Sequence, residues 1–232
     1  MKIILKLKEQ IINSFPQLFV LYNLYIRHKI FIKKPYYSDG GEDKFIINQF
    51  KKKSGFYVDV GCHHPLRINN CHLLYLNSWR GINIDINKIS IELFNYVRKN
   101  DVNLHNAVSL KEKDIKFFYD KPLSPYNSLV KTKNLKFTKT VKSQKLTKLI
   151  DRTKFKNKKI DFLSVDVEGK DLEVLKSLNF KIYQPKYICV EICSKEKNKK
   201  FNLKKNLIYK FLVNKKYKLV FNKKEKYIFK SS

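Results

Sequence analysis

Short runs of apolar residues alternate along most of the chain with stretches that have helical periodicity. The apolar runs predict strands at 56–61, 81–86, 102–108, 115–119, 160–166 and 186–192. Helices are predicted between several of them, at 70–78, 87–99 and 170–179; in the last, Leu172, Leu175 and Leu178 share one face. Apolar strands that alternate with helices indicate a mostly parallel sheet covered on both sides, which is an α/β fold.

The two ends of the chain depart from this pattern. Residues 1–35 predict an N-terminal helical appendage, and residues 36–232 form the main predicted domain. Near the C-terminus, a helix at 203–213 precedes two short strands, YKLVF and KYIF, which predict an antiparallel hairpin at the sheet edge. The segment 120–145 has two prolines and no regular period, so it predicts a long connection of the kind that often builds a binding site.

The charge of the chain restricts its partners. The sequence has 50 Lys+Arg and 20 Asp+Glu, a formal net charge of +30, which suggests nucleic acid or an anionic membrane. Only five of the basic residues are arginine, and the lysines are spread along the whole chain. Proteins that read nucleic acid depend on the bidentate guanidinium group, so the composition argues against a specific nucleic-acid site.

The N-terminal segment carries an apolar stripe beside lysines. The stripe comprises Ile3, Ile4, Leu7, Ile11, Ile12 and Phe15, next to Lys2, Lys6 and Lys8. Residues 1–32 therefore predict docking on the main domain, which is favoured, or peripheral contact with an anionic membrane surface. The most apolar run, 18–26, is too short to span a bilayer, so we expect no transmembrane span and a cytoplasmic protein.

The cysteines and histidines do not predict a metal centre. A zinc site would have to use residues from Cys62, His63, His64, Cys71 and His72. The chain contains no C-x-x-C pair, and these spacings fit no common structural zinc site. Reduced thiols are the expected state, since no pair has the spacing of a disulfide framework.

The first predicted strand ends in GFYVDVGCHHP, where Gly61 allows a tight turn or the close approach of a ligand. A dinucleotide fingerprint would need glycines at the positions of His63 and Leu66, so a nicotinamide-dependent oxidoreductase is disfavoured. The second strand ends in GINIDIN, which places Asp85 24 residues after Gly61, where a carboxylate can accept both hydroxyls of a ribose. A nucleoside without phosphates fits both facts, and S-adenosylmethionine is the common one.

Five sequence blocks follow one another along the chain: GFYVDVGCHHP, NNCHLLYLNSWRGINIDIN, NAVS, IDFLSVDVEGKDLEVLKSL and PKYICVEI. Their order and spacing resemble the FkbM-type family of S-adenosylmethionine-dependent methyltransferases over residues 36–193, with GED at 41–43 matching an acidic signature. The resemblance implies a class I Rossmann-like methyltransferase fold and methyl transfer, typically to a hydroxyl of a sugar or polyketide-like acceptor. Cys62 and Cys71 depart from the family, where Ala and Thr are usual.

Five residues are expected on the cofactor side of the site: Gly61, and four residues that each have a structural alternative. Asp85 is expected to bind the ribose, or to cap the helix that starts at 87. Asp59 is expected near the methionine end of the cofactor, or to cap the following turn. Asn106 is expected to contact adenine, or to be a strand-end turn residue. Glu42, with Asp43, is expected on the cofactor side, or the two acids simply begin the helix that follows.

The acceptor side is predicted from SVDVEG at 164–169. Asp166 and Glu168 point to the same side where a buried strand ends, and in open α/β sheets ligands bind there. They can hold and deprotonate an acceptor hydroxyl or chelate a divalent ion; the alternative is that they cap the helix near 170. We expect a metal-independent base, because no third ligand is evident in the sequence. His64 is expected in substrate binding or proton transfer, or else as a surface loop residue, and Glu191 is either a structural acid or part of the acceptor site.

These residues predict an S-adenosylmethionine-dependent methyltransferase whose acceptor is the hydroxyl of a glycan or another small molecule. An RNA-directed methyltransferase would keep the same cofactor. A non-catalytic nucleoside-binding module would keep the fold without turnover, but the acids at both Asp85 and Asp166 argue against it.

Overall fold

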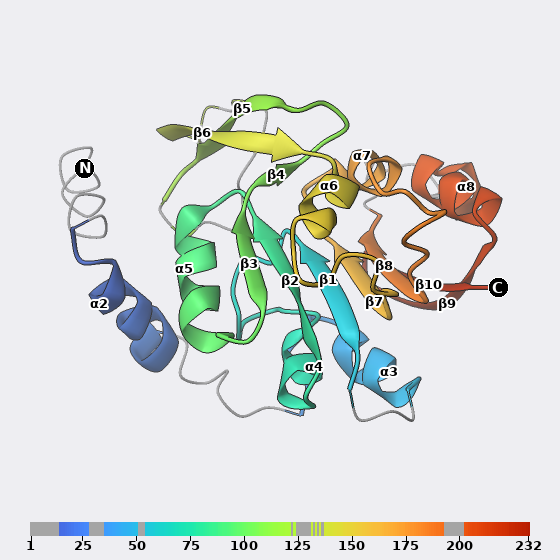
Figure 1. The fold of residues 1–232 in the computed structure, drawn as a ribbon, viewed down its shortest axis with the longest axis horizontal. Helices are drawn as coiled ribbons and strands as arrows, with labels where there is room; N and C mark the ends of the chain where they lie inside the picture. Colours follow the sequence, from blue (N-terminus) through green and yellow to red (C-terminus); the bar gives the residue numbers. More distant parts are fainter. Residues whose placement is uncertain are drawn as a thin grey trace.

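A computed structural model of the chain describes residues 14–27, 35–50, 54–121, 137–192 and 202–232, together with 123, 131, 133 and 135. Its centre is a seven-stranded sheet with the order β3-β2-β1-β7-β8-β10-β9 (Figure 1). The parallel strands are β1 (Phe56–Val60), β2 (Arg80–Asp85), β3 (Val102–His105), β7 (Phe162–Val165) and β8 (Tyr187–Glu191).

The C-terminal hairpin completes this sheet. Its strands β9 (Tyr217–Lys223) and β10 (Lys226–Ser231) are antiparallel, and β10 is also antiparallel to β8. The structure thus confirms the predicted α/β class, with a mostly parallel sheet and a C-terminal antiparallel hairpin.

Helices cover both faces of the sheet because side chains alternate along each buried strand. In β1, Phe56, Val58 and Val60 belong to one apolar cluster, and Tyr57 belongs to another. The first cluster includes residues of α6 (Leu146–Asp151), α7 (Asp171–Lys176) and α8 (Leu207–Asn214). The second includes residues of α3 (Glu42–Asn48) and α4 (His72–Leu76), while α5 (Lys88–Val97) packs on β2 and β3.

A second, three-stranded sheet corrects two predictions. It has the order β4-β6-β5, formed by β4 (Ala107–Val108), β5 (Lys113–Tyr119) and β6 (Phe137–Gln144). The predicted strand 102–108 is two strands, because the chain leaves the main sheet at Asn106, whose N–H donates to the carbonyl of Asp85 (3.1 Å). The prediction of an irregular segment over 120–145 is wrong for its last part, where β6 lies. The apolar pattern of β6 is weak, since of its two buried residues, Val141 and Ser143, only Val141 is apolar.

The described N-terminal residues form α2 (Pro16–Leu21) and a π-helix, Tyr22–Arg27, beside α5 (Figure 1). Phe19 and Leu24 pack in an apolar cluster with Leu66 and Leu93. The stripe from Ile3 to Ile12 lies outside the described residues. In the part of the chain that the structure describes, no helix has the length and apolar character needed to cross a membrane.

Candidate active site

A cavity of about 440 Å³ opens where the parallel strands end. Its walls come from the ends of β1, β2 and β8, the turn after β7, the first residue of β10, and the small sheet. The chain connections leave in opposite directions from β1 and β7, which are neighbours in the sheet. This is the switch point at which open α/β sheets bind ligands.

Gly61 brings two strand ends together at the base of this cavity. Its φ is +80°, and a Cβ at this position would lie 1.9 Å from the carbonyl oxygen of Asp166. Its N–H donates to the carbonyl of Ile84 (2.9 Å). Gly61 is therefore required by the close packing of the β1 turn against the residue that follows β7, in addition to any ligand that approaches it.

Asp85 faces the cavity from the end of β2. Its Oδ2 accepts from the N–H of His63 (2.9 Å) and its Oδ1 from the N–H of Asn87 (2.7 Å). Burial raises the pKa of this carboxyl to about 6, although the two backbone donors oppose the shift. The N-cap of α5 is Asn87, whose side chain accepts from the N–H of Ile89, so the helix-cap alternative for Asp85 is wrong.

An apolar wall lies beside Asp85. Ile86, Ala107, Val108 and Ile115 line the cavity there, and the last three belong to the small sheet. Asn106 lies next to this wall, and its Nδ2 donates to the carbonyl of Lys142 (3.2 Å). The wall is not evident from the sequence, because it forms only when β4 and β5 leave the main sheet.

Three carboxylates meet at another part of the cavity lining. One ligand atom from each of Asp166, Glu168 and Glu191 lies within 4.8 Å of the others. Nζ of Lys226 is 2.6 Å from Oδ2 of Asp166 and 3.0 Å from Oε1 of Glu191. We call these four residues the acidic cluster. Asp166 and Glu191 each receive a hydrogen bond from Lys226, whereas Glu168 is exposed toward the cavity.

The electrostatics of the acidic cluster distinguish its members. Although Glu168 is exposed to the cavity, the surrounding protein partly desolvates its carboxyl and raises its pKa to about 7, and the charges of Glu191 and Asp166 add to this effect. Burial and the charge of Asp166 also raise the pKa of Glu191, while Lys226 lowers it. For Lys226 itself, burial lowers the pKa, but the charges of Asp166 and Glu191 raise it above its ordinary value. The protonation of Glu168 is therefore expected to change near neutral pH.

Glu168 also has an unusual backbone conformation. Glu168 has φ of +51°, a left-handed conformation that is uncommon for a residue with a Cβ and is frequent at functional sites. The following helix, α7, begins at Asp171 with Lys170 as its N-cap, so the alternative that Asp166 and Glu168 cap this helix is wrong. Asp171 is buried behind the acidic cluster, and burial and the charge of Asp166 raise its pKa to about 7.

Two members of the acidic cluster were not fully anticipated. No third metal ligand is evident in the sequence. In the structure, Glu191 provides a third carboxylate beside Asp166 and Glu168, because β7 and β8 are neighbours in the sheet. Lys226 was missed. It pairs with Glu191 in the register of β10 and β8, and an antiparallel hairpin places the start of its second strand at the end of the parallel strand beside it.

Three predicted site residues lie outside the lining of the cavity. Asp59 is buried and accepts from Nδ2 of Asn69 (3.0 Å), because strand alternation directs its side chain to a sheet face. His64 is buried, and its Nδ1 accepts from the N–H groups of Leu66 and Arg67 (both 3.1 Å). Its neighbour His63 lines the cavity instead.

Glu42 is the third residue outside the lining. Its Oε2 accepts from the N–H of Gly40 (2.9 Å), and it is the first residue of α3, followed by Asp43. The alternative that these acids begin a helix is therefore confirmed. The cofactor roles expected for Glu42 and Asp59 stay predictions.

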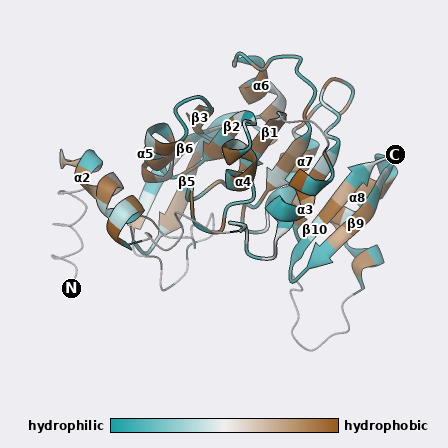
Figure 2. Ribbon diagram, turned by 90° about the horizontal axis from the view of Figure 1, so that it is seen from below, coloured by the Kyte–Doolittle hydropathy of each residue, from teal (hydrophilic) through white to brown (hydrophobic). Residues whose placement is uncertain are grey.

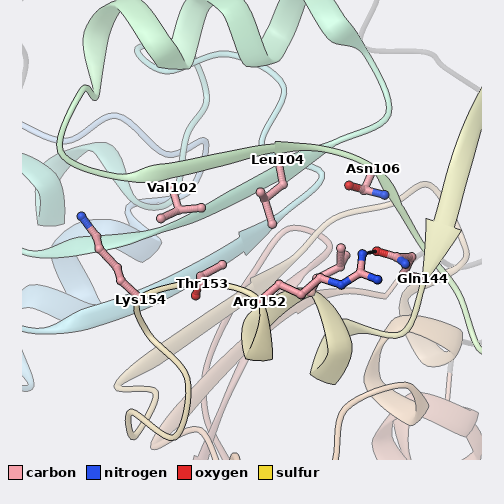
Figure 3. A pocket seen from close by; sticks show the side chains of 8 residues that line it. Val102, Leu104, Asn106, Gln144, Arg152, Thr153 and Lys154 are labelled. Atoms are coloured by element: carbon pink, nitrogen blue, oxygen red, sulfur yellow. Dashed lines mark hydrogen bonds between the residues drawn. The ribbon is translucent and has the colours of Figure 1, made fainter.

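A second cavity, of about 370 Å³, lies beside the edge strand β3 (Figure 3). Val102 and Leu104 form part of its wall, and Arg152 lies across from them with its Nη1 donating to Oε1 of Gln144 (2.6 Å). Asn106 lines both cavities. Among the described residues, those that line the second cavity include no carboxylate, so the first cavity is the candidate active site.

Comparison with known proteins identifies a family. The model of the methyltransferase FkbM domain matches residues 59–219. A TehB-like SAM-dependent methyltransferase from Corynebacterium glutamicum is 9% identical, with 87% of this chain and 90% of that chain covered and a TM-score of 0.44. A Sulfolobus solfataricus structure assigned to the type 11 methyltransferases is 15% identical, with coverages of 84% and 95% and a TM-score of 0.42. No curated protein matches the chain.

Proposed function

Because the chain belongs to the methyltransferase FkbM domain family, we propose that it is an S-adenosylmethionine-dependent methyltransferase that acts on a hydroxyl of a sugar, a glycan or a related small molecule. One observation carries this proposal. A single cavity is lined both by Asp85, a carboxylate suited to a ribose, and by the acidic cluster, which is suited to an acceptor hydroxyl.

The residues around Asp85 fit the cofactor. Each carboxylate oxygen of Asp85 already accepts one backbone N–H and has a further lone pair for a hydroxyl. Ile86, Val108 and Ile115 offer an apolar surface for a flat base, and the amide of Asn106 lies beside them. When bound, S-adenosylmethionine supplies an activated methyl group on a sulfonium.

Glu168 is the proposed proton acceptor for the hydroxyl. An unactivated alcohol is a poor nucleophile and must lose its proton, and a base works best when its pKa is near the operating pH. The pKa of Glu168 is about 7, and this carboxylate is exposed to the cavity. A positioned base contributes roughly 10² to 10⁴-fold, whereas correct orientation of the reactants contributes about 7–11 kcal/mol, so the walls of the cavity matter more than the base.

Lys226 is the proposed positioning residue of the acidic cluster. Its ammonium group contacts both Asp166 and Glu191, so it fixes both carboxylates beside Glu168 and offsets part of their charge. The same three acids have the donor set of a divalent cation site. An ammonium that already neutralises two of them disfavours a second cation, which supports a metal-independent base.

The first test of the proposed function is cofactor binding. S-adenosylmethionine and its demethylated product are each expected to give heat in calorimetry and to raise the melting temperature. A ligand at 100 times its Kd stabilises the folded state by about 2.7 kcal/mol. A nicotinamide dinucleotide at the same concentration is the control and is expected to have no effect. Absence of both heat and stabilisation at millimolar S-adenosylmethionine would contradict the assignment.

Replacing Lys226 with Met is expected to move the acidic limb of the pH profile of kcat/KM to higher pH. Without the ammonium, Glu168 and Glu191 lose a positive charge that lowers their pKa, so they take up a proton more readily. Lys226→Arg keeps the charge and is expected to restore the wild-type limb. A purely structural role would instead lower the melting temperature of Lys226→Met and leave the pH profile unmoved.

A further inference from the structure

The N-terminal helical segment exposes one apolar face. Phe15, Leu18 and Tyr22 follow one another at helical spacing, and Tyr25 and Ile26 continue the same face. Leu18 is 64% exposed and Ile26 is 65% exposed, although both are large apolar side chains. We call these five residues the outer face. Figure 2 shows hydrophobic residues, in brown, on α2.

The opposite face of this segment is docked on the domain. Phe19 and Leu24 pack with Leu66 and Leu93, and Nδ2 of the buried Asn23 donates to the carbonyl of Phe19 (2.8 Å). The packing of Phe19 and Leu24 fixes which side of the segment points outward. Docking on the domain, one of the two alternatives from the sequence, therefore applies to the inner face of this segment.

The sequence in and beside this segment carries only positive charge, which indicates its partner. Residues 10–38 contain no Asp or Glu, and their basic residues include Arg27, Lys29, Lys33 and Lys34. On the neighbouring helix α5, the exposed Tyr96 interacts with Tyr25. In a second copy of this chain the same stretch of sequence would also be cationic, which disfavours self-association through this face.

We propose that the outer face docks on an anionic membrane surface. Exposed Leu and Ile side chains can enter the boundary between headgroups and acyl chains, and tyrosines are favoured at this depth because their rings are apolar and their hydroxyls polar. Arg27 at the end of the segment and the lysines that follow it in the sequence, in a chain of net charge +30, attract anionic lipids. This proposal does not depend on the methyltransferase activity.

Membrane docking would lie next to the candidate active site. Leu66, which packs against the inner side of the segment, is followed in the chain by Arg67 and Ile68, and both of these line the cavity. The docked segment and the active-site cavity therefore share the loop at 63–68. An acceptor held at the membrane surface would be close to the loop at 63–68, which contributes residues to the lining of the cavity.

Vesicle flotation of the full chain tests the proposal. Wild-type protein is expected to float with vesicles of phosphatidylcholine and phosphatidylglycerol, and much less with phosphatidylcholine alone. Leu18→Glu and Ile26→Glu are each expected to weaken binding to the mixed vesicles by about tenfold or more, since each removes one apolar side chain that would be buried in the membrane. The matched control is Leu207→Glu, which changes a residue that is 67% exposed on α8, at the other end of the molecule (Figure 1).

Three other outcomes would overturn the proposal. Equal recovery of wild type, Leu18→Glu and Ile26→Glu would overturn the proposal, and so would an equal loss in Leu207→Glu, which would reflect net charge alone. A wild-type dimer that Leu18→Glu converts to a monomer without lipid would overturn it too, because the outer face would then be a self-interface. If Leu18→Glu lowers the melting temperature, Leu18→Ala measures the same loss of apolar contact without a buried charge.

Discussion

Replacing Glu168 with Gln is expected to lower kcat by roughly 10² to 10⁴-fold while the affinity for S-adenosylmethionine stays within about twofold of wild type. The amide fills the same space but cannot take a proton. Wild-type activity should rise as the pH increases through about 7, because the pKa of Glu168 is about 7 and only the ionised form is a base. Steady-state kinetics from mildly acidic to mildly alkaline pH measure both effects.

The control for Glu168→Gln is Glu112→Gln, which removes an exposed carboxylate paired with Lys148, away from the cavity. It is expected to keep wild-type kcat. Wild-type turnover by Glu168→Gln, together with a large loss in Asp166→Asn, would make Asp166 the base. Loss of wild-type activity with EDTA and its recovery with Mg²⁺ would instead make the three acids metal ligands.

Replacing Asp85 with Asn is expected to raise the Kd for S-adenosylmethionine on the order of 10²-fold. Hydrogen bonds to a charged acceptor contribute roughly 1.5–3 kcal/mol each, and about 1.4 kcal/mol corresponds to tenfold in affinity. The pKa of Asp85 is about 6, so wild-type affinity should fall as the pH drops below about 6 and the carboxylate becomes protonated. The amide variant should lack this pH dependence. Isothermal calorimetry on both sides of this pH tests both expectations.

Asp85 also accepts the N–H groups of His63 and Asn87, so the folding of Asp85→Asn must be checked. The amide keeps one oxygen as an acceptor and can retain one of these two hydrogen bonds, so a small decrease in melting temperature is expected. A Kd equal to that of wild type at every pH would show that Asp85 holds the loop at 61–63 and does not bind the ribose.

The fold was predictable where local pattern and tertiary environment agree. The central strands β1, β7 and β8 are buried on both sides, so their apolar runs identify them directly. The strand β6 was not predictable, since one face is exposed and lysines and threonines occupy several of its positions. Its place in a second sheet depends on its pairing with β4 and β5, which lie in an earlier part of the chain.

Within the candidate site, the sequence determined which residues end the strands. Asp85 and Asp166 were identified because each follows or closes an apolar run, and such positions meet at one edge of a parallel sheet. The same argument also selected Asp59 and His64, which lie outside the cavity lining. A position near a strand end does not determine where the side chain points. That direction depends on the alternation of side chains along the strand and on the conformation of the turn that follows.

Only the tertiary structure brought Glu191 and Lys226 to Asp166 and Glu168. Asp166 and Lys226 are 60 positions apart in the chain, and the proximity of the four residues follows from the order β7-β8-β10 and from the register that pairs Lys226 with Glu191. The pKa of Glu168 likewise depends on burial and on charges from other strands. Sequence alone determined the kinds of group at the strand ends; strand order and register, which arise from contacts distant in sequence, determined which of these groups interact.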